Sequence, residues 1–166
     1  MPLFFEPISL TLILALAGLT LLYAAYRDIK ARLIPNASIV ILALLFIPLC
    51  LLLSINPIFN VLIFFVVFLF TFFCFHRRWL GGGDAKLIPV VGLWVGPSGI
   101  LPFLLMMTLG GVLVAMVLMM VHAKRTRGKQ GWKSLKLPYG VAIAASALIV
   151  IGGQHIPTLV EMWGAL

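Results

Sequence analysis

The sequence predicts an all-α integral membrane protein with six transmembrane helices, both termini outside and a short fourth helix. Of its 166 residues 63% are hydrophobic and only 10% are charged, and the mean hydropathy is +1.21, well above the values of soluble domains. Several apolar stretches reach about 17 to 25 residues, the length that crosses a bilayer as a helix. Basic residues gather in a few short segments between these stretches. We therefore expect one polytopic membrane domain over 1–166.

Uninterrupted apolar length and turn residues set the expected spans. The first apolar run is expected to be a retained span, because no basic segment precedes it and no small-residue cleavage site follows it. The uncharged stretch 87–121 would extend about 50 Å as one helix, whereas the hydrocarbon core is about 30 Å thick. The turn residues Gly96–Gly99 and Pro102 divide it into a short helix and a full one. The expected spans are 8–26, 35–53, 57–75, 85–96, 99–121 and 138–154.

Charge placement supports this division. The twelve basic residues form three clusters, whereas the turns at 54–57 and 96–99 carry no charge. Lys and Arg accumulate in cytoplasmic loops, and six crossings put all three clusters on that side of the cytoplasmic (inner) membrane. A single crossing for 87–121 would place the last cluster outside. The clusters are Arg27, Lys30 and Arg32; Arg77, Arg78 and Lys86; and Lys124, Arg125, Arg127, Lys129, Lys133 and Lys136.

Composition also excludes several kinds of site. The net charge of +8 reflects this topology and attraction to anionic lipid headgroups at the cytoplasmic face, so we expect no nucleic-acid partner. Cys50 and Cys74 lie in apolar runs without a C-x-x-C pattern, so neither a zinc site nor a disulfide framework is expected. The segment 155–166 is expected to be interfacial on the outer face.

Two of the four acidic residues are candidates for catalysis. On the expected topology Glu6 and Glu161 face outside, whereas Asp28 and Asp84 both face the cytoplasm. A single aspartate at the membrane boundary is usually an interfacial anchor. Two aspartates at the same depth, each beside a motif that shapes the backbone, favour a functional site instead.

The two motifs differ in how they shape the chain. In Ile34-Pro35-Asn36, proline favours an extended residue before it, and Asn36 can cap the following helix. Gly81-Gly82-Gly83 before Asp84 removes three side chains and permits positive φ, so that another group can approach the backbone. An ordinary flexible start of a helix capped by Asp84 explains the same glycines equally well.

These segments resemble a known family. Asp28-Ile-Lys-Ala-Arg-Leu-Ile-Pro35-Asn36 and Gly81-Gly-Gly-Asp84-Ala-Lys86 are similar to the two motifs of the type IV prepilin peptidases, which are G-x-G-D aspartyl proteases of the membrane. Pro138-Tyr139-Gly140-Val-Ala-Ile-Ala resembles the start of that family's last helix. The resemblance implies six spans and cleavage of the short basic leader of pilin-like precursors at the cytoplasmic membrane face. It assigns catalysis to Asp28 and Asp84, and substrate contact and backbone shaping to Gly81, Gly82, Gly83, Ile34, Pro35, Asn36 and Lys86.

The sequence departs from the longer members of this family in one respect. Longer family members carry a cytoplasmic insertion with paired cysteines that is associated with N-methylation of the new terminus, and this sequence lacks it. We therefore expect the peptidase without the N-methyltransferase, similar to the short enzymes of tight-adherence (Flp-type) pilus systems. The sequence leaves the oligomeric state and the identity of the precursor open.

A carboxyl pair suits amide hydrolysis without metal or cofactor. One ionised group takes a proton from water, and one protonated group polarises the carbonyl. The positive end of a helix dipole favours ionised Asp84 as the base, and the negative end leaves Asp28 as the acid.

Two alternatives belong to other classes. Gly96-Pro97-Ser98-Gly99 matches the G-x-S-G of rhomboid serine proteases, and Ser98 with His155 would then be the catalytic pair, although turns and interfacial histidines explain both residues. A small proton or cation transporter would use Asp28 and Asp84 as its binding groups. Acids in mid-span and a repeated half would favour the transporter, but both aspartates lie at the cytoplasmic ends of the expected spans and the two halves of the sequence do not resemble each other.

Overall fold

The computed structural model describes residues 5–126 and 139–164, and these residues are almost entirely α-helical. Four of the helices are long and apolar enough to cross a membrane, and α2 is a shorter apolar helix. This agrees with a multi-pass membrane protein. The helices are α1 (Phe5–Ala31), α2 (Asn36–Leu52), α3 (Pro57–His76), α4 (Gly82–Thr126) and α5 (Tyr139–Gly164).

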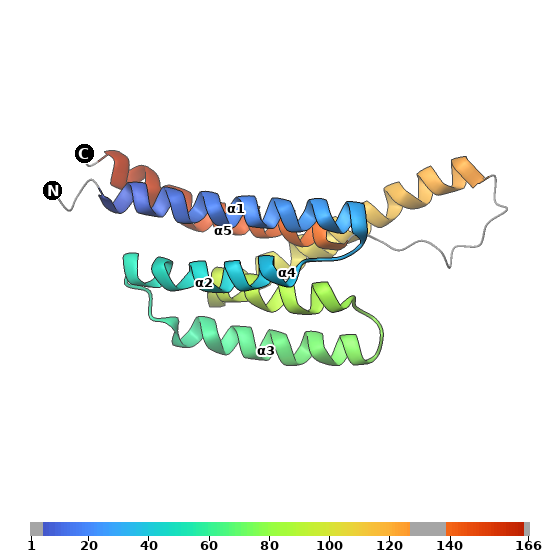
Figure 1. Cartoon of the computed structure of the whole chain (residues 1–166), viewed down its shortest axis with the longest axis horizontal. Coiled ribbons are helices and arrows are strands. Elements are labelled where there is room, and N and C mark those ends of the chain that lie inside the picture. The colour runs from blue at the N-terminus through green and yellow to red at the C-terminus, as the bar shows by residue number, and fades with distance from the viewer. Residues whose placement is uncertain (1–4, 127–138, 165–166) are drawn as a thin grey trace.

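The helices lie side by side along the long axis of the molecule (Figure 1). α1 packs against α2 and α5, and α4 packs against α2, α3 and α5. The start of α1 and the end of α5 lie at one end, whereas the α1–α2 and α3–α4 connections lie at the other (Figure 1). The two motifs that are more than forty residues apart in the sequence are therefore at the same end of the bundle.

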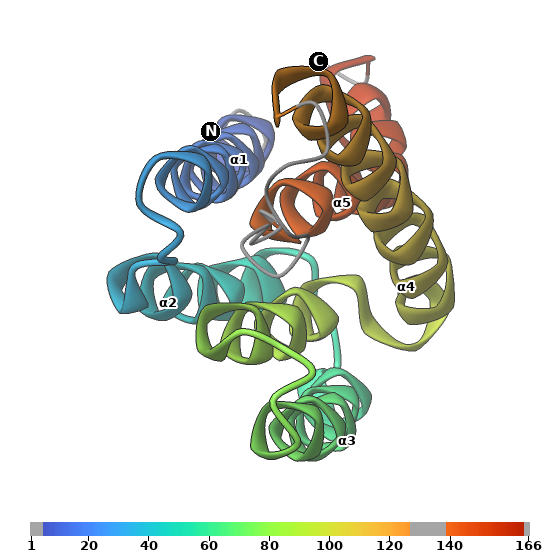
Figure 2. The ribbon, with the colours of Figure 1, turned by 90° about the vertical axis from the view of Figure 1, so that its right-hand side faces the viewer.

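α4 consists of two helices joined at Gly96, which has the non-helical angles φ 59° and ψ −166°. The chain reverses its direction there (Figure 1), so the second helix of α4 runs back beside α5 (Figure 2). Pro97 has no N–H for the carbonyl of Leu93, four residues earlier, and the side-chain amide of Asn60 donates to that carbonyl instead at 2.8 Å. The sequence predicted this division, and the reversal is what six crossings require; the number of crossings itself stays a prediction.

A second proline of α4 is compensated in the same way. Pro89 has no N–H for the carbonyl of Ala85, and the hydroxyl of Thr71 donates to that carbonyl at 2.9 Å. In an apolar surrounding a carbonyl without a partner is costly. Two polar side chains of α3 thus satisfy the backbone of α4 at two of its three prolines, which explains why Asn60 and Thr71 are buried in a largely apolar helix.

The exposed side chains of α3 are almost all apolar, and most of the buried core lies between the other helices. Phenylalanine side chains of α3, among them Phe59, Phe65, Phe70 and Phe72, are more than half exposed, as expected for a helix that faces lipid rather than water. Buried apolar side chains from α1, α2, α4 and α5 form the core between the helices. Its fully buried members include Leu10, Leu21, Leu42, Leu49, Leu87, Phe103 and Ile143.

The last helix differs from the expectation. We expected a span over 138–154 and a separate interfacial segment over 155–166, but α5 continues without a break to Gly164 and contains Pro157. Proline is tolerated here because only the carbonyl of Gly153 loses its helical partner. Residues 138, 165 and 166 lie outside the described residues, as does most of the third basic cluster.

Candidate active site

A cavity of ≈ 270 Å³ lies between the end of α1, the α1–α2 connection and the start of α4. Both aspartates singled out in the sequence line it, with all three glycines of the second motif and Ile34 of the first. Pro35, Asn36 and Lys86 are not among its lining residues. The lining residues are Asp28, Arg32, Leu33, Ile34, Gly81, Gly82, Gly83 and Asp84.

Asp28 is held by a third element. The backbone N–H of Gly140, in the first turn of α5, donates to Oδ2 of Asp28 at 2.7 Å. A Cβ atom on Gly140 would lie 2.8 Å from the same oxygen, so only glycine allows this contact without displacement. Sequence reasoning assigned Gly140 no role; the Tyr139-Gly140 pair at the start of a span was the available signal.

Asp84 lies in the first turn of α4, and its carboxyl group folds back over Gly81. A Cβ atom on Gly81 would lie 2.8 Å from Oδ2 of Asp84. The carbonyl of Gly81 also accepts the N–H of Ala85 at 2.9 Å, which starts the helix. Among the described glycines only Gly96 has a positive φ. The glycines before Asp84 therefore serve close approach, and the positive φ that the sequence permitted is not used.

Gly83 brings the two motifs together. A Cβ atom on Gly83 would lie 2.9 Å from Cβ of Ile34, a distance that real side chains do not reach. Gly82 is less constrained, because its nearest neighbour is the ring edge of Phe75 at 3.2 Å. All three glycines line the cavity, but only the first and third lack room for a side chain, beside Asp84 and Ile34, whereas the second meets the edge of an exposed ring.

Asn36 has a different role from the one expected. The residue that precedes α2 is Pro35, whose backbone is extended (φ −65°, ψ 134°) and whose side chain makes no capping bond. Asn36 is the first residue of the helix, and its Oδ1 accepts a hydrogen bond from Nζ of Lys86 at 3.2 Å. The prediction that Asn36 caps α2 was wrong, and the residue links the two motifs instead. Because the hydrogen bond between Lys86 and Asn36 is exposed to solvent, it adds little stability.

Arg32 is a cavity residue that sequence reasoning did not single out. Its φ of 54° is unusual for a residue other than glycine and costs about 1–2 kcal/mol. The conformation closes α1, because the N–H of Arg32 bonds to the carbonyl of Asp28 at 2.9 Å. The end of α1 thus places Arg32 among the residues that line the cavity together with both aspartates.

The serine–histidine alternative is not supported by the geometry. The hydroxyl of Ser98 accepts a hydrogen bond from Nε2 of Gln154 at 3.2 Å. Nε2 of His155 is buried and has no hydrogen-bond partner within the described residues. Because Gln154 and His155 are neighbours on one helix, their side chains point about 100° apart. Ser98 therefore faces the amide rather than the imidazole.

Comparison with known proteins adds the decisive observation. Residues 12–123, more than half of the chain, match the type IV leader peptidase family. The chain belongs to this family. The matched segment contains both aspartate motifs and ends before α5, so the contact of Gly140 with Asp28 lies outside it. Membership supports a leader-peptidase type of protease. No curated protein and no solved structure matches the chain.

Proposed function

We propose that this protein is an aspartyl endopeptidase that uses Asp28 and Asp84 to remove the short basic leader of pilin-like precursors. The observation that carries the proposal is the shared cavity, which two carboxyl groups line together with three glycines. A carboxyl pair supplies both the base and the acid of amide hydrolysis. The side-chain-free backbone of Gly81–Gly83 leaves room for an extended substrate strand against the main chain.

We assign the roles within the pair from the contacts of each carboxyl group. The sequence favoured Asp84 as the base, because Asp28 lies near the negative end of α1. The N–H of Gly140 donates to Asp28 from the first turn of α5, however, and a donor at a helix start favours an ionised carboxylate. Asp28 then takes the proton from water, and protonated Asp84 polarises the scissile carbonyl and delivers its proton to the leaving amine.

The substrate and the location are part of the same proposal. The site lies at the bundle end that carries the first two basic clusters, which we place at the cytoplasmic face of the inner membrane against anionic headgroups. The connections between α1 and α2 and between α3 and α4 are only a few residues long. They leave no space for a methyltransferase insertion at those positions, and we therefore propose peptidase activity alone.

Cleavage by the purified protein in liposomes tests the proposal. The substrate is a synthetic precursor with a short lysine-containing leader and an apolar helix of about 20 residues. We expect a single cut before the apolar segment, and a loss of at least about 100-fold in Asp28→Asn and in Asp84→Asn. Ser98→Ala is the matched control and should cleave like the wild type. Loss of cleavage in Ser98→Ala, with both Asn variants active, would support the serine protease instead.

The same proteoliposomes test the transporter alternative. A pH-sensitive dye inside them reports proton uptake driven by a pH gradient. We expect no uptake above that of empty liposomes. Uptake that disappears in the Asn variants, without any precursor cleavage by the wild type, would favour the transporter.

A further inference from the structure

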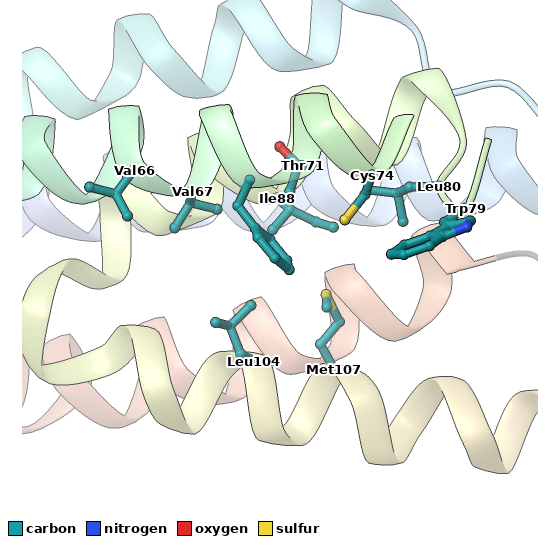
Figure 3. A pocket seen from close by; sticks show the side chains of 10 residues that line it. Val66, Val67, Thr71, Cys74, Trp79, Leu80, Ile88, Leu104 and Met107 are labelled. Carbon is teal, nitrogen blue, oxygen red and sulfur yellow. The ribbon is translucent and has the colours of Figure 1, made fainter. Parts of the chain in front are cut away.

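A second cavity, of ≈ 440 Å³, opens between α3 and the second helix of α4. We call it the apolar groove. Side chains of α3 and Ile88 face Leu104 and Met107 across it, with Trp79 and Leu80 at one end (Figure 3). Almost all of its wall is hydrocarbon. The lining residues are Val66, Val67, Phe70, Thr71, Cys74, Trp79, Leu80, Ile88, Leu104 and Met107.

We call the cavity that Asp28 and Asp84 line the catalytic cavity, after the function proposed for it. The apolar groove adjoins it along the start of α4. Leu80 lines the groove, and the next residue, Gly81, lines the cavity. Ile88 follows Asp84 by four residues, which places the two side chains on the same helix face about 6 Å apart along the axis. A chain segment in the groove would therefore meet Asp84 within about one helical turn.

We propose that the apolar groove binds the apolar helix that follows the scissile bond of the precursor. The inference rests on the proposed function. Because the leader is short and polar, the bond to be cut lies where the substrate enters the membrane, and its apolar helix must descend beside Asp84. An apolar helix docks through the side chains of one face in a hydrophobic groove. The substrate contact predicted from the sequence at Gly81–Gly83 would then continue into the membrane at Leu80 and Ile88.

Charge at this end of the bundle makes apolar binding necessary. Arg27 and Lys30 lie near the end of α1, and Arg77 and Arg78 directly follow α3. All four are therefore at this end of the bundle, where they repel a basic leader. The leader can therefore contribute little attraction apart from that of the headgroups. The binding free energy has to come from burial of the apolar helix, at roughly 25 cal/mol for each Å² of apolar surface.

Two other cavities between helices are less suited to this substrate. The cavity of ≈ 320 Å³ at Ile13 and Leu51 lies near the start of α1, at the opposite end from Asp28. The cavity of ≈ 190 Å³ between α1 and α5 reaches only to Leu21, about 10 Å from Asp28 along the helix. Neither adjoins the catalytic cavity as the apolar groove does.

Cross-linking tests the position of the substrate directly. Cys74 lines the apolar groove and is a free thiol, so Cys50→Ser leaves one natural probe. Asp84→Asn keeps the bound precursor intact. Single cysteines are then placed at successive positions of the precursor's apolar segment, and disulfide formation with Cys74 is measured. We expect maxima every three to four positions, as one helix face meets the groove.

The control moves the probe to the lipid-facing side of the same helix. Leu69→Cys, in a chain without Cys50 and Cys74, carries a thiol at a position that is 66% exposed, and it should give no periodic cross-linking. Equal cross-linking at both probes, or none at Cys74, would overturn the proposal.

Filling the groove provides a second test with its own control. Met107→Trp should raise KM for the membrane-anchored precursor at least tenfold. It should leave unchanged the kcat/KM for a short peptide that ends a few residues after the cut, which also shows that the variant is folded. Leu109→Trp, on the lipid-facing side of the same helix, should change neither.

If Met107→Trp leaves the KM for the anchored precursor unchanged, the groove holds a lipid acyl chain or nothing, and the proposal is wrong. Failure of the wild type to cut either substrate would instead refute the proposed function.

Discussion

Gly140 and Asp28 join the last helix to the first at the catalytic cavity, through a hydrogen bond of 2.7 Å from a backbone N–H to a carboxyl oxygen. This bond fixes the carboxyl group, and a side chain on Gly140 would occupy its place. We predict that Gly140→Ala lowers kcat by about 100-fold, because a displacement of about 1 Å at a catalytic group has that effect. Gly153→Ala, on the same helix with nothing within 4 Å, should retain wild-type activity. Equal activity in the two variants would show that Gly140 does not position Asp28.

The three glycines before Asp84 should differ in their tolerance of alanine. At Gly81 the new Cβ atom meets the carboxyl group of Asp84, and at Gly83 it meets Cβ of Ile34, both below 3.0 Å. Gly81→Ala and Gly83→Ala should therefore lose about 10- to 100-fold in kcat/KM. At Gly82 the ring of Phe75 can turn aside, so Gly82→Ala should stay within about threefold of the wild type. If Gly82→Ala is as inactive as the other two, flexibility rather than close contact explains the motif.

The polar residues of α3 should matter for stability. Thr71→Val and Asn60→Leu each remove the donor of a backbone carbonyl that lies four residues before a proline of α4. We expect each to lower the free energy of unfolding by about 1–3 kcal/mol, measured by denaturation in mixed micelles. Thr108→Val is the matched control, because its exposed hydroxyl bonds only within its own helix; it should change stability by about 0.5 kcal/mol or less. A similar loss in all three variants would remove the special role of the proline-freed carbonyls.

The sequence predicted much of this arrangement, and its misses have physical reasons. Hydropathy and charge predicted the helical membrane class and the turn at Gly96, because membrane helices are governed by length and polarity. The two aspartates could be paired before their shared cavity was known, since both motifs were recognisable locally. The contact between Asp28 and Gly140 spans 112 positions, and no local pattern reveals which backbone N–H reaches a carboxyl group that far away.

Arg32 was missed, and the capping role predicted for Asn36 was wrong, because local preference decides neither position. A positive φ at an arginine contradicts its intrinsic preference, and it occurs here where the N–H of Arg32 bonds to the carbonyl of Asp28 and ends α1. The side chain of Asn36 binds Lys86 across fifty positions instead of the nearby backbone that its usual capping preference suggests. Local propensity fails at Asn36 because a contact between distant parts of the chain outweighs it.

The six-crossing topology predicts where single cysteines can be labelled. In a chain without Cys50 and Cys74, a membrane-impermeant thiol reagent should label Ser54→Cys and Ser98→Cys in intact cells. Both side chains are exposed and lie in the uncharged turns. Arg78→Cys, three residues before Gly81, should be labelled only after permeabilisation. Labelling of position 78 in intact cells would place the aspartates outside and rule out a cytoplasmic site.

The pH dependence of cleavage should show that two carboxyl groups act together. One of them must be ionised and the other protonated, so the rate should rise as the first loses its proton and fall as the second does. We therefore predict a bell-shaped profile of kcat/KM, measured with the short peptide so that membrane binding does not contribute. Chelators should not change it, since a carboxyl pair supplies both the base and the acid without a metal ion. The roles assigned above also make Gly140→Ala shift the acidic limb to higher pH, because the donor that favours ionised Asp28 is displaced. If Gly140→Ala shifts the basic limb instead, Asp28 is the acid and Asp84 the base. A rate that falls when a chelator is added would contradict the two-aspartate mechanism.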